Sequence, residues 1–303
     1  NPSIVNVIIT WNSSEISGGG INFMYDSSPE LENVTIADNS YNHGGGISCY
    51  ESDPILENVM ITGNWAEGVG STGGGGIWCS YSSLSLVNVT ITGNTFEDSG
   101  GGIYCYFHSN PSLVNVTITD NSANFGGGIL CNASSPILVN CIFWNNSPQE
   151  VEFWFFDGPS TITIAYSDID GGEWGIDTHN NGTVNWLEGN IDADPLFVDE
   201  EMGDYHLTED SPCIDSGTSY FEYEGTVLVN LSEDEYYGSA PDMGAYESLF
   251  TSFETDELII QNSKFKIQNF PNPFNPETDI LFELSSGSNV LLEIYNVKGQ
   301  RVT

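Results

Sequence analysis

The sequence predicts an all-β solenoid with about 25–30 residues per coil. A short unit recurs along residues 1–150, and a recurrence every 20–50 residues is typical of solenoids, propellers and arrays. Each unit holds two short β-rich pieces, such as "NVTIT" and "GGGIYC", and none has apolar residues at helical spacing. A propeller blade needs about 40–50 residues, so each unit is interpreted as one coil of a parallel β-helix. The first Asn of each unit falls at Asn6, Asn33, Asn58, Asn88, Asn115 and Asn140.

Within each unit, two apolar positions lie two residues apart. Val and then Ile occupy them in successive units. Because side chains alternate along a strand, residues at this spacing point to the same face, which is expected to be the core. The pairs are Val34 and Ile36, Val59 and Ile61, Val89 and Ile91, and Val116 and Ile118.

A second Asn follows the inward Ile by three residues. Equivalent positions of stacked coils lie about 4.8 Å apart, so these side chains can bond to one another as Asn ladders do in stacked sheets. We therefore expect a structural ladder at one corner of the solenoid. Its members are Asn39, Asn64, Asn94 and Asn121.

Glycines and then an Ile-x-Cys pair open the next side of each coil. Glycine permits a tight bend and close backbone approach. The Cys residues occupy one inward position of four successive coils, Cys49, Cys79, Cys105 and Cys131. No Cys-x-x-Cys occurs and no His recurs near them, which argues against zinc. Two interpretations stay open: a column of buried thiols acting as small apolar groups, or disulfides between coils in an oxidising exterior.

The Ile-x-x-Asn and Gly-Gly-Gly-Ile pattern resembles the right-handed parallel β-helix repeats of bacterial surface proteins, including polymorphic outer-membrane proteins. The resemblance covers residues 1–150, where six copies keep their register. It implies a right-handed β-helix on a secreted or cell-surface protein.

Residues 150–250 carry a weaker repeat followed by a distinct closing pattern. "NIDADPLF", "DYHL", "SPCIDSG" and "PDMGAYE" appear in that order. Their succession resembles the closing segment of secreted bacterial β-helix proteins. The resemblance implies that residues 185–250 complete and cap a solenoid spanning residues 1–250, consistent with the need of terminal repeats for a polar outer face.

The tail forms a separate region. Residues 251–268 are interpreted as a linker, and residues 269–303 contain "FPNPFNP" and "LEIYNVKGQRV". This tail resembles the sorting domain of type IX secretion substrates, a small β-sandwich. The resemblance implies the type IX secretion machinery as a partner and a location outside a Gram-negative cell or on its outer surface. The chain begins inside a repeat and its tail spans about half of such a domain, so we expect further sequence at both ends.

Charge is distributed unevenly along the chain. The net charge is −39, and all four basic residues lie after residue 263. Nucleic-acid binding requires Lys and Arg to neutralise phosphates, so no nucleic-acid partner is expected. Anionic membranes would be repelled, and no apolar run is long enough for a transmembrane segment. A lyase acting on acidic glycans would need a basic catalytic residue, and the four His occupy unrelated positions in the repeat.

Aromatic residues on the Gly-Ile side are the first candidate for ligand binding. Trp78 and Tyr104 lie between Ile and Cys, and alternation predicts that they point outward on adjacent coils. Tyr50 and Tyr106 would flank this strip. Such rings could bind a polysaccharide or cell-surface glycan, or could serve only to stabilise the sheet through cross-strand pairs.

Two further candidates involve carboxylates. A glycosidase needs two acids at a set separation, and Asp168, Asp170, Asp192 and Asp194 are available for that chemistry. Calcium is the only cofactor considered. Its candidate ligands lie near Asp168 and Asp170 and near Glu200 and Asp204, although no calcium-binding loop motif is present.

The leading hypothesis is a non-catalytic, adhesin-like or glycan-contacting rod exported by type IX secretion, with no catalytic residues. One alternative is a glycoside hydrolase acting on neutral or weakly charged polysaccharide. Another is an extracellular structural module that forms filaments. The sequence does not indicate the oligomeric state.

Overall fold

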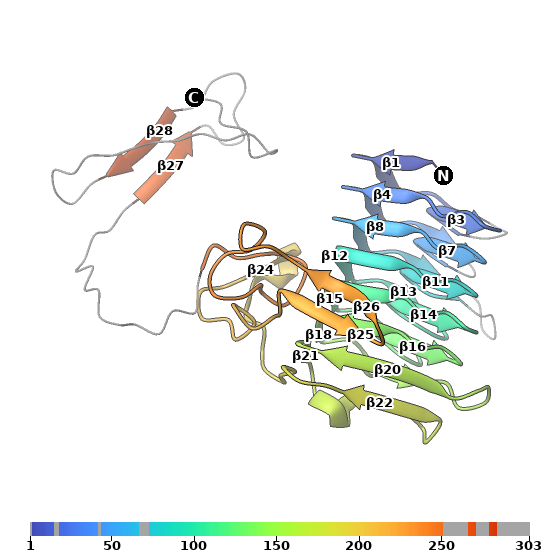
Figure 1. The fold of residues 1–303 in the computed structure, drawn as a ribbon. Helices are drawn as coiled ribbons and strands as arrows, with labels where there is room; N and C mark the ends of the chain where they lie inside the picture. The colour runs from blue at the N-terminus through green and yellow to red at the C-terminus, as the bar shows by residue number, and fades with distance from the viewer. Residues whose placement is uncertain are drawn as a thin grey trace. The chain divides into compact units, whose positions relative to one another are not determined.

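The computed structural model describes residues 2–14, 18–41, 44–66 and 73–250, together with strands β27 (Lys266–Phe270) and β28 (Asp279–Glu283). The chain divides into two compact units, Asn1–Phe253 and Glu254–Thr303. The first is an all-β parallel solenoid of about seven turns (Figure 1), as the sequence predicts. In the second, β27 and β28 pair in antiparallel fashion. The rest of the predicted linker, residues 251–268, and of the predicted sorting domain, residues 269–303, lies outside the described residues.

The coils stack into three parallel sheets, of which the smallest has strands from only three coils. The 13-stranded sheet consists of β1 (Ser3–Val5), β2 (Ile8–Thr10), β4 (Glu30–Glu32), β5 (Thr35–Ala37), β8 (Ile55–Glu57), β9 (Met60–Thr62), β12 (Ser85–Thr92), β15 (Ser112–Thr119), β17 (Ile137–Val139), β18 (Ile142–Trp144), β20 (Ser160–Ala165), β21 (Asp168–Ile169) and β22 (Gly182–Trp186). The 6-stranded sheet consists of β3 (Ile21–Met24), β7 (Ile47–Tyr50), β11 (Ile77–Ser80), β14 (Ile103–Tyr106), β16 (Ile129–Asn132) and β19 (Val151–Phe153). The 3-stranded sheet consists of β6 (Ser40–Tyr41), β10 (Trp65–Ala66) and β13 (Thr95–Phe96).

The first Asn of each unit bends the 13-stranded sheet. Asn58, Asn88 and Asn115 have φ of 53°, 53° and 52°, a left-handed conformation that Asn tolerates better than most residues. Their side chains also bond along the solenoid axis, with Asn115 Nδ2 donating to Asn88 Oδ1 at 3.2 Å. The repeated Asn therefore keeps the bend in the same place in successive coils.

The second Asn of each unit forms a buried ladder. The backbone N–H and the side-chain Nδ2 of Asn94 both donate to Asn121 Oδ1, each at 2.9 Å. The same arrangement joins Asn39 to Asn64 and Asn64 to Asn94. The ladder continues through Asn146 and ends at Glu150, whose Oε1 accepts from the Asn146 backbone N–H at 2.9 Å.

The core lies inside the coils and is built from the predicted inward positions. Val89 pairs in register with Val116, Ile91 with Ile118, and Cys79 with Cys105. All of these residues are fully buried. All six Cys are free and buried, which agrees with the thiol interpretation of the column rather than with disulfides between coils.

Residues 195–250 pack along the outer face of the 13-stranded sheet, and we call them the lateral strap. Tyr205 lies 2.6 Å from Thr92, hydroxyl to hydroxyl, and the Ala245 N–H donates to Thr117 Oγ1 at 3.0 Å. The strap runs back toward earlier coils. Its elements are β23 (Phe197–Asp199), η2 (Glu200–Met202), β24 (Asp204–Leu207), β25 (Tyr220–Tyr223) and β26 (Thr226–Asn230).

Among the residues that the structure describes, helical structure is confined to two short turns. The 3-10 turn η1 (Gly172–Gly175) lies in a late coil, and η2 lies in the strap. Of the residues that the structure describes, none forms a helix with the length and apolarity needed to cross a bilayer.

Candidate functional site

The aromatic strip predicted at Trp78 and Tyr104 is not an exposed surface. The two residues do lie side by side on β11 and β14. However, Tyr104 is only 2% exposed and Trp78 is half-buried. The Tyr104 hydroxyl accepts a hydrogen bond from Asn132 Nδ2 at 3.3 Å, and burial raises the pKa of this tyrosine. The prediction of an exposed ring at Tyr104 is therefore wrong.

A neighbouring turn explains this burial. Gly100 has φ +73°, and a Cβ placed on it would lie 2.6 Å from the Cβ of Tyr104. The backbone before the Gly-Gly-Ile segment therefore passes directly over the outward side chain of the next strand. Gly126 lies over Leu130 in the same way. Side chains that point outward from the strand at Tyr104 and Leu130 are therefore not exposed to solvent.

An exposed row of aromatic rings lies at the next corner instead. Tyr25 contacts Tyr50 with ring centroids 5.6 Å apart, Tyr50 contacts Tyr81 at 6.3 Å, and Tyr81 contacts Phe107 at 6.3 Å. Tyr106 contacts Phe107 at 4.3 Å. We call these five residues the aromatic stripe. Tyr25 and Tyr81 are 63% and 48% exposed, and the other three rings are half-buried, so the stripe is partly open to solvent.

The four candidate glycosidase carboxylates occupy different environments. Asp168 is fully buried, and its oxygens accept from the Ala193 N–H at 3.1 Å and the Cys213 thiol at 3.2 Å. Burial raises its pKa to about 6. Asp170, Asp192 and Asp194 are exposed. Asp168 joins a late coil to the strap and has no free face for a substrate, so it does not fit the predicted catalytic role.

Of the residues predicted as calcium ligands, Asp204 has a hydrogen-bond partner of its own. Asp204 bonds to His206, with Oδ1 and Nδ1 2.7 Å apart, and this bond lowers the pKa of the carboxyl. Burial raises the pKa of Glu200, with further contributions from Asp120 and Asp194. In the described part of the chain, none of these residues belongs to a group of three metal-ligating side chains.

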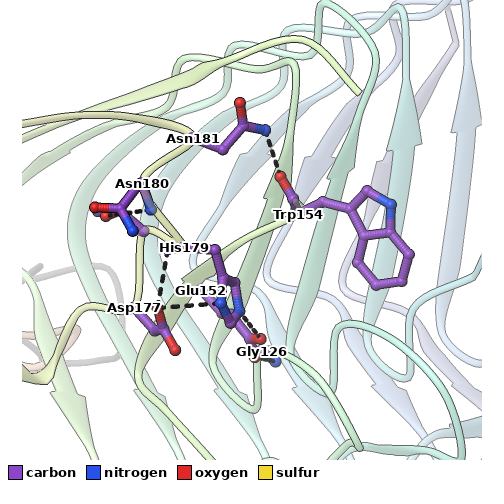
Figure 2. Close-up of polar contacts among 8 residues, drawn as sticks. Gly126, Glu152, Trp154, Asp177, His179, Asn180 and Asn181 are labelled. Carbon is purple, nitrogen blue, oxygen red and sulfur yellow. Dashed lines mark hydrogen bonds and ion pairs between the residues drawn. The ribbon is translucent and has the colours of Figure 1, made fainter. Parts of the chain in front are cut away.

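One such group does occur, at Glu152, Asp177 and His179 (Figure 2). Glu152 comes from β19, and Asp177 pairs with it across the next coil. His179 Nε2 lies 2.8 Å from Glu152 Oε1, and His179 Nδ1 lies 3.4 Å from Asp177 Oδ1. The other oxygen of Glu152 accepts from the Gly126 N–H at 2.6 Å. We call these three side chains the histidine–carboxylate cluster.

A second aromatic surface borders this cluster. Phe155 contacts His179 with centroids 5.4 Å apart and contacts Phe156 at 4.1 Å. Phe155 and Phe156 are exposed. Figure 2 shows the indole of Trp154 directed away from the cluster. His179 therefore contacts one exposed aromatic ring, Phe155, and two carboxylates.

A model of the right-handed β-helix region matches residues 19–192, which is more than half of the chain. The chain belongs to the right-handed β-helix family. The matched region includes the aromatic stripe and the histidine–carboxylate cluster and stops before the lateral strap. Neither the curated proteins nor the solved structures contain a significant match to this chain.

This β-helix also has a cleft of about 360 Å³ between the strap and the 13-stranded sheet. Val87, Val114 and Leu228 contribute apolar surface, and Glu57 and Glu247 are among the acidic residues that line it. Because its two walls are far apart in the sequence, no local motif indicates it. None of the predicted site residues lines this cleft.

The repeat does not indicate the histidine–carboxylate cluster, because the four His occupy unrelated positions in it. A different signal was present. Glu152 replaces the apolar residue that occupies the equivalent position in the preceding coil, Leu130, and Asp177 follows Glu152 by one repeat of 25 residues. Two acids at equivalent positions of adjacent coils lie side by side, and a nearby His then completes the group.

Proposed function

We propose that this β-helix is a non-catalytic, glycan-contacting protein of the cell exterior. The observation that carries the proposal is the aromatic stripe, in which five rings contact one another across successive coils. The C–H faces of a sugar ring pack on aromatic rings, which offer a large apolar contact area. Because coils repeat about every 4.8 Å, the stripe suits an extended polysaccharide better than a single sugar.

Polar groups beside the stripe support the same ligand class. Asp26, Glu51, Asp53 and His108 are exposed at this corner. Carboxylates accept hydrogen bonds from sugar hydroxyls. Residues 1–263 contain no Lys or Arg, so an acidic polysaccharide would meet repulsion. The proposed ligand is therefore a neutral glycan.

The proposed route to the exterior rests on the tail. The "FPNPFNP" and "LEIYNVKGQRV" segments resemble type IX sorting domains. Export by that route to the outer surface of a Gram-negative cell, or beyond it, agrees with a glycan ligand. The hydrolase alternative lacks a specific supporting observation, because Asp168 has no free face.

Binding to a panel of soluble neutral polysaccharides by affinity electrophoresis tests the proposal. Tyr50→Ala and Tyr81→Asn remove rings from the stripe, and Asn suits the left-handed backbone of Tyr81, where φ is 51°. Each should weaken binding about five- to tenfold, since a ring contact contributes about 1 kcal/mol.

Trp174→Ala is the matched control, because Trp174 is 97% exposed and lies away from the stripe on η1. It should leave binding unchanged. Equal losses in all three variants, or no binding to any neutral glycan, would refute the stripe as the contact surface. Release of reducing ends in the same samples would overturn the non-catalytic assignment.

A further inference from the structure

We propose that the histidine–carboxylate cluster binds a divalent transition-metal ion of the Zn²⁺ class. The three side chains each offer one ligand atom, and these atoms lie within 4.8 Å of one another. His179 Nε2 and Glu152 Oε1 are 2.8 Å apart. Two ligands of a tetrahedral ion with bonds of about 2.0–2.2 Å lie about 3.3–3.6 Å apart, so this pair needs to separate by only about 0.5–0.8 Å to coordinate one ion.

The charge of the surroundings favours a cation at this point. The Glu152 side chain is only 5% exposed, and a buried carboxylate is costly unless it is paired. Residues 1–263 offer no Lys or Arg for that role. Both nitrogens of His179 face carboxylate oxygens. A metal ion would supply the missing positive charge.

The fold holds the ligands in place from two adjacent coils. Glu152 lies on β19, and the backbone of Asp177 is paired with it. The Gly126 N–H holds the Glu152 oxygen that does not face His179. Such bonds to a ligand's second oxygen orient it and support metal affinity. The side chains of His179 and Asp177 are 32% and 42% exposed, so an ion and its water ligands can reach the site.

The donor set selects the class of metal. One imidazole and two carboxylates suit Zn²⁺ and its neighbours, whereas Ca²⁺ and Mg²⁺ prefer oxygen ligands alone. Three protein ligands also leave coordination positions open to water. His206 is a useful contrast, because it has one carboxylate partner, Asp204, at 2.7 Å. A His–Asp pair of that kind offers only two ligands.

Isothermal titration of the metal-free full chain with ZnCl₂, and separately with CaCl₂, tests the proposal. We expect one Zn²⁺ per chain and a Zn²⁺-dependent rise in melting temperature. Glu152→Gln and His179→Asn should each weaken Zn²⁺ binding at least tenfold and abolish the thermal shift. Asn is chosen because His179 has φ of 46°, which Asn tolerates. His206→Asn should retain full binding.

The melting temperature of each variant without metal, measured first, shows that it is folded. Absence of Zn²⁺ binding in the parent chain would overturn the proposal. Equal affinity of the parent and His179→Asn chains, or equal binding of Ca²⁺ and Zn²⁺, would also overturn it.

Discussion

The solenoid and the lateral strap bury the two faces of the same sheet by different means. The inner face is covered by repetition, since each coil places the same residues in register with the next. The outer face is covered by a non-repeating segment with antiparallel hairpins, held by individual side chains such as Tyr205 and Tyr246. Equivalent residues therefore have different burial along the solenoid.

The outward position two residues after the bend shows the difference. Thr90 and Thr117 occupy this position beneath the strap and are buried, whereas Thr35 and Met60 occupy it in earlier coils and are half-buried. The four residues share one slot of the repeat. Their environments differ because the strap reaches only some coils, so the repeat defines the inner face but not the outer one.

Raising the pH should give the largest decrease in stability. The solenoid and the strap should lose stability at different pH values. In the solenoid, Glu150 closes the buried Asn ladder, and burial raises its pKa from 4.5 to about 8. Between these values the folded chain binds more protons than the unfolded chain, so the free energy of unfolding falls as pH rises. The decrease should be at most about 5 kcal/mol between pH 4.5 and 9.

Urea denaturation of Glu150→Gln across this pH range measures the contribution. Its dependence on pH should be flatter than that of Glu57→Gln, which removes the same charge from an exposed position. In the strap, burial raises the pKa of Asp242 to about 7. Hydrogen exchange of residues 195–250 should therefore accelerate at a lower pH than hydrogen exchange of the solenoid. Identical pH profiles for the two Gln variants would exclude Glu150 as the source.

Replacing Asn121 by Ala should give the next largest loss. Asn121 is buried and bonds to Asn94, Asn146 and the Ile91 carbonyl. Its removal leaves several buried polar groups unpaired, at about 1–3 kcal/mol each, so we expect a loss of about 4 kcal/mol in unfolding free energy. Asn12→Ala, at the exposed end of the same ladder, should cost about 1 kcal/mol. Equal losses at both positions would mean that buried ladder bonds do not account for the stability that Asn121 provides.

The repeat allowed most of the solenoid to be predicted. Inward Val, Ile and Cys positions follow from strand alternation, and the ladder at Asn39, Asn64, Asn94 and Asn121 follows from stacking. The strap could not be placed in this way, because its contacts join residues such as Thr117 and Ala245 that are 128 positions apart. Non-local contacts of a non-repeating segment leave no periodic signal.

The candidate sites were harder to predict for the same reason. Tyr104 points out of its strand as expected, but the backbone at Gly100 covers it. Tyr50 and Tyr106 do lie in the aromatic stripe, whereas Tyr25, Tyr81 and Phe107 enter it through left-handed corner residues outside the strand pattern. Strand alternation predicts the direction in which a side chain points, but it does not predict which residues cover that side chain.

Replacing Tyr205 should lower the stability of the strap without lowering that of the solenoid. Its ring packs against Phe197 with centroids 5.4 Å apart, and its hydroxyl contacts Thr92. Tyr205→Ala should destabilise the strap by about 3 kcal/mol, as for other large buried aromatic residues. Hydrogen exchange should increase across residues 195–250 while amides of β12 and β15 stay protected. Tyr220→Ala, at an exposed position of β25, is the control, and joint loss of protection in sheet and strap would show one cooperative unit.

The smallest effect concerns the thiol column inside the coils. Cys105 is fully buried between Cys79 and Cys131, and its contact with the Cys131 thiol, together with burial, raises the pKa of its own thiol. Cys105→Ala should cost about 1 kcal/mol, because only a small apolar group is lost. Cys105→Ser should cost more, since it buries a hydroxyl. Thiol titration should find six Cys that react after unfolding without reductant. Fewer than six reactive thiols would support disulfides between coils. A loss of several kcal/mol in unfolding free energy from Cys105→Ala would also support them.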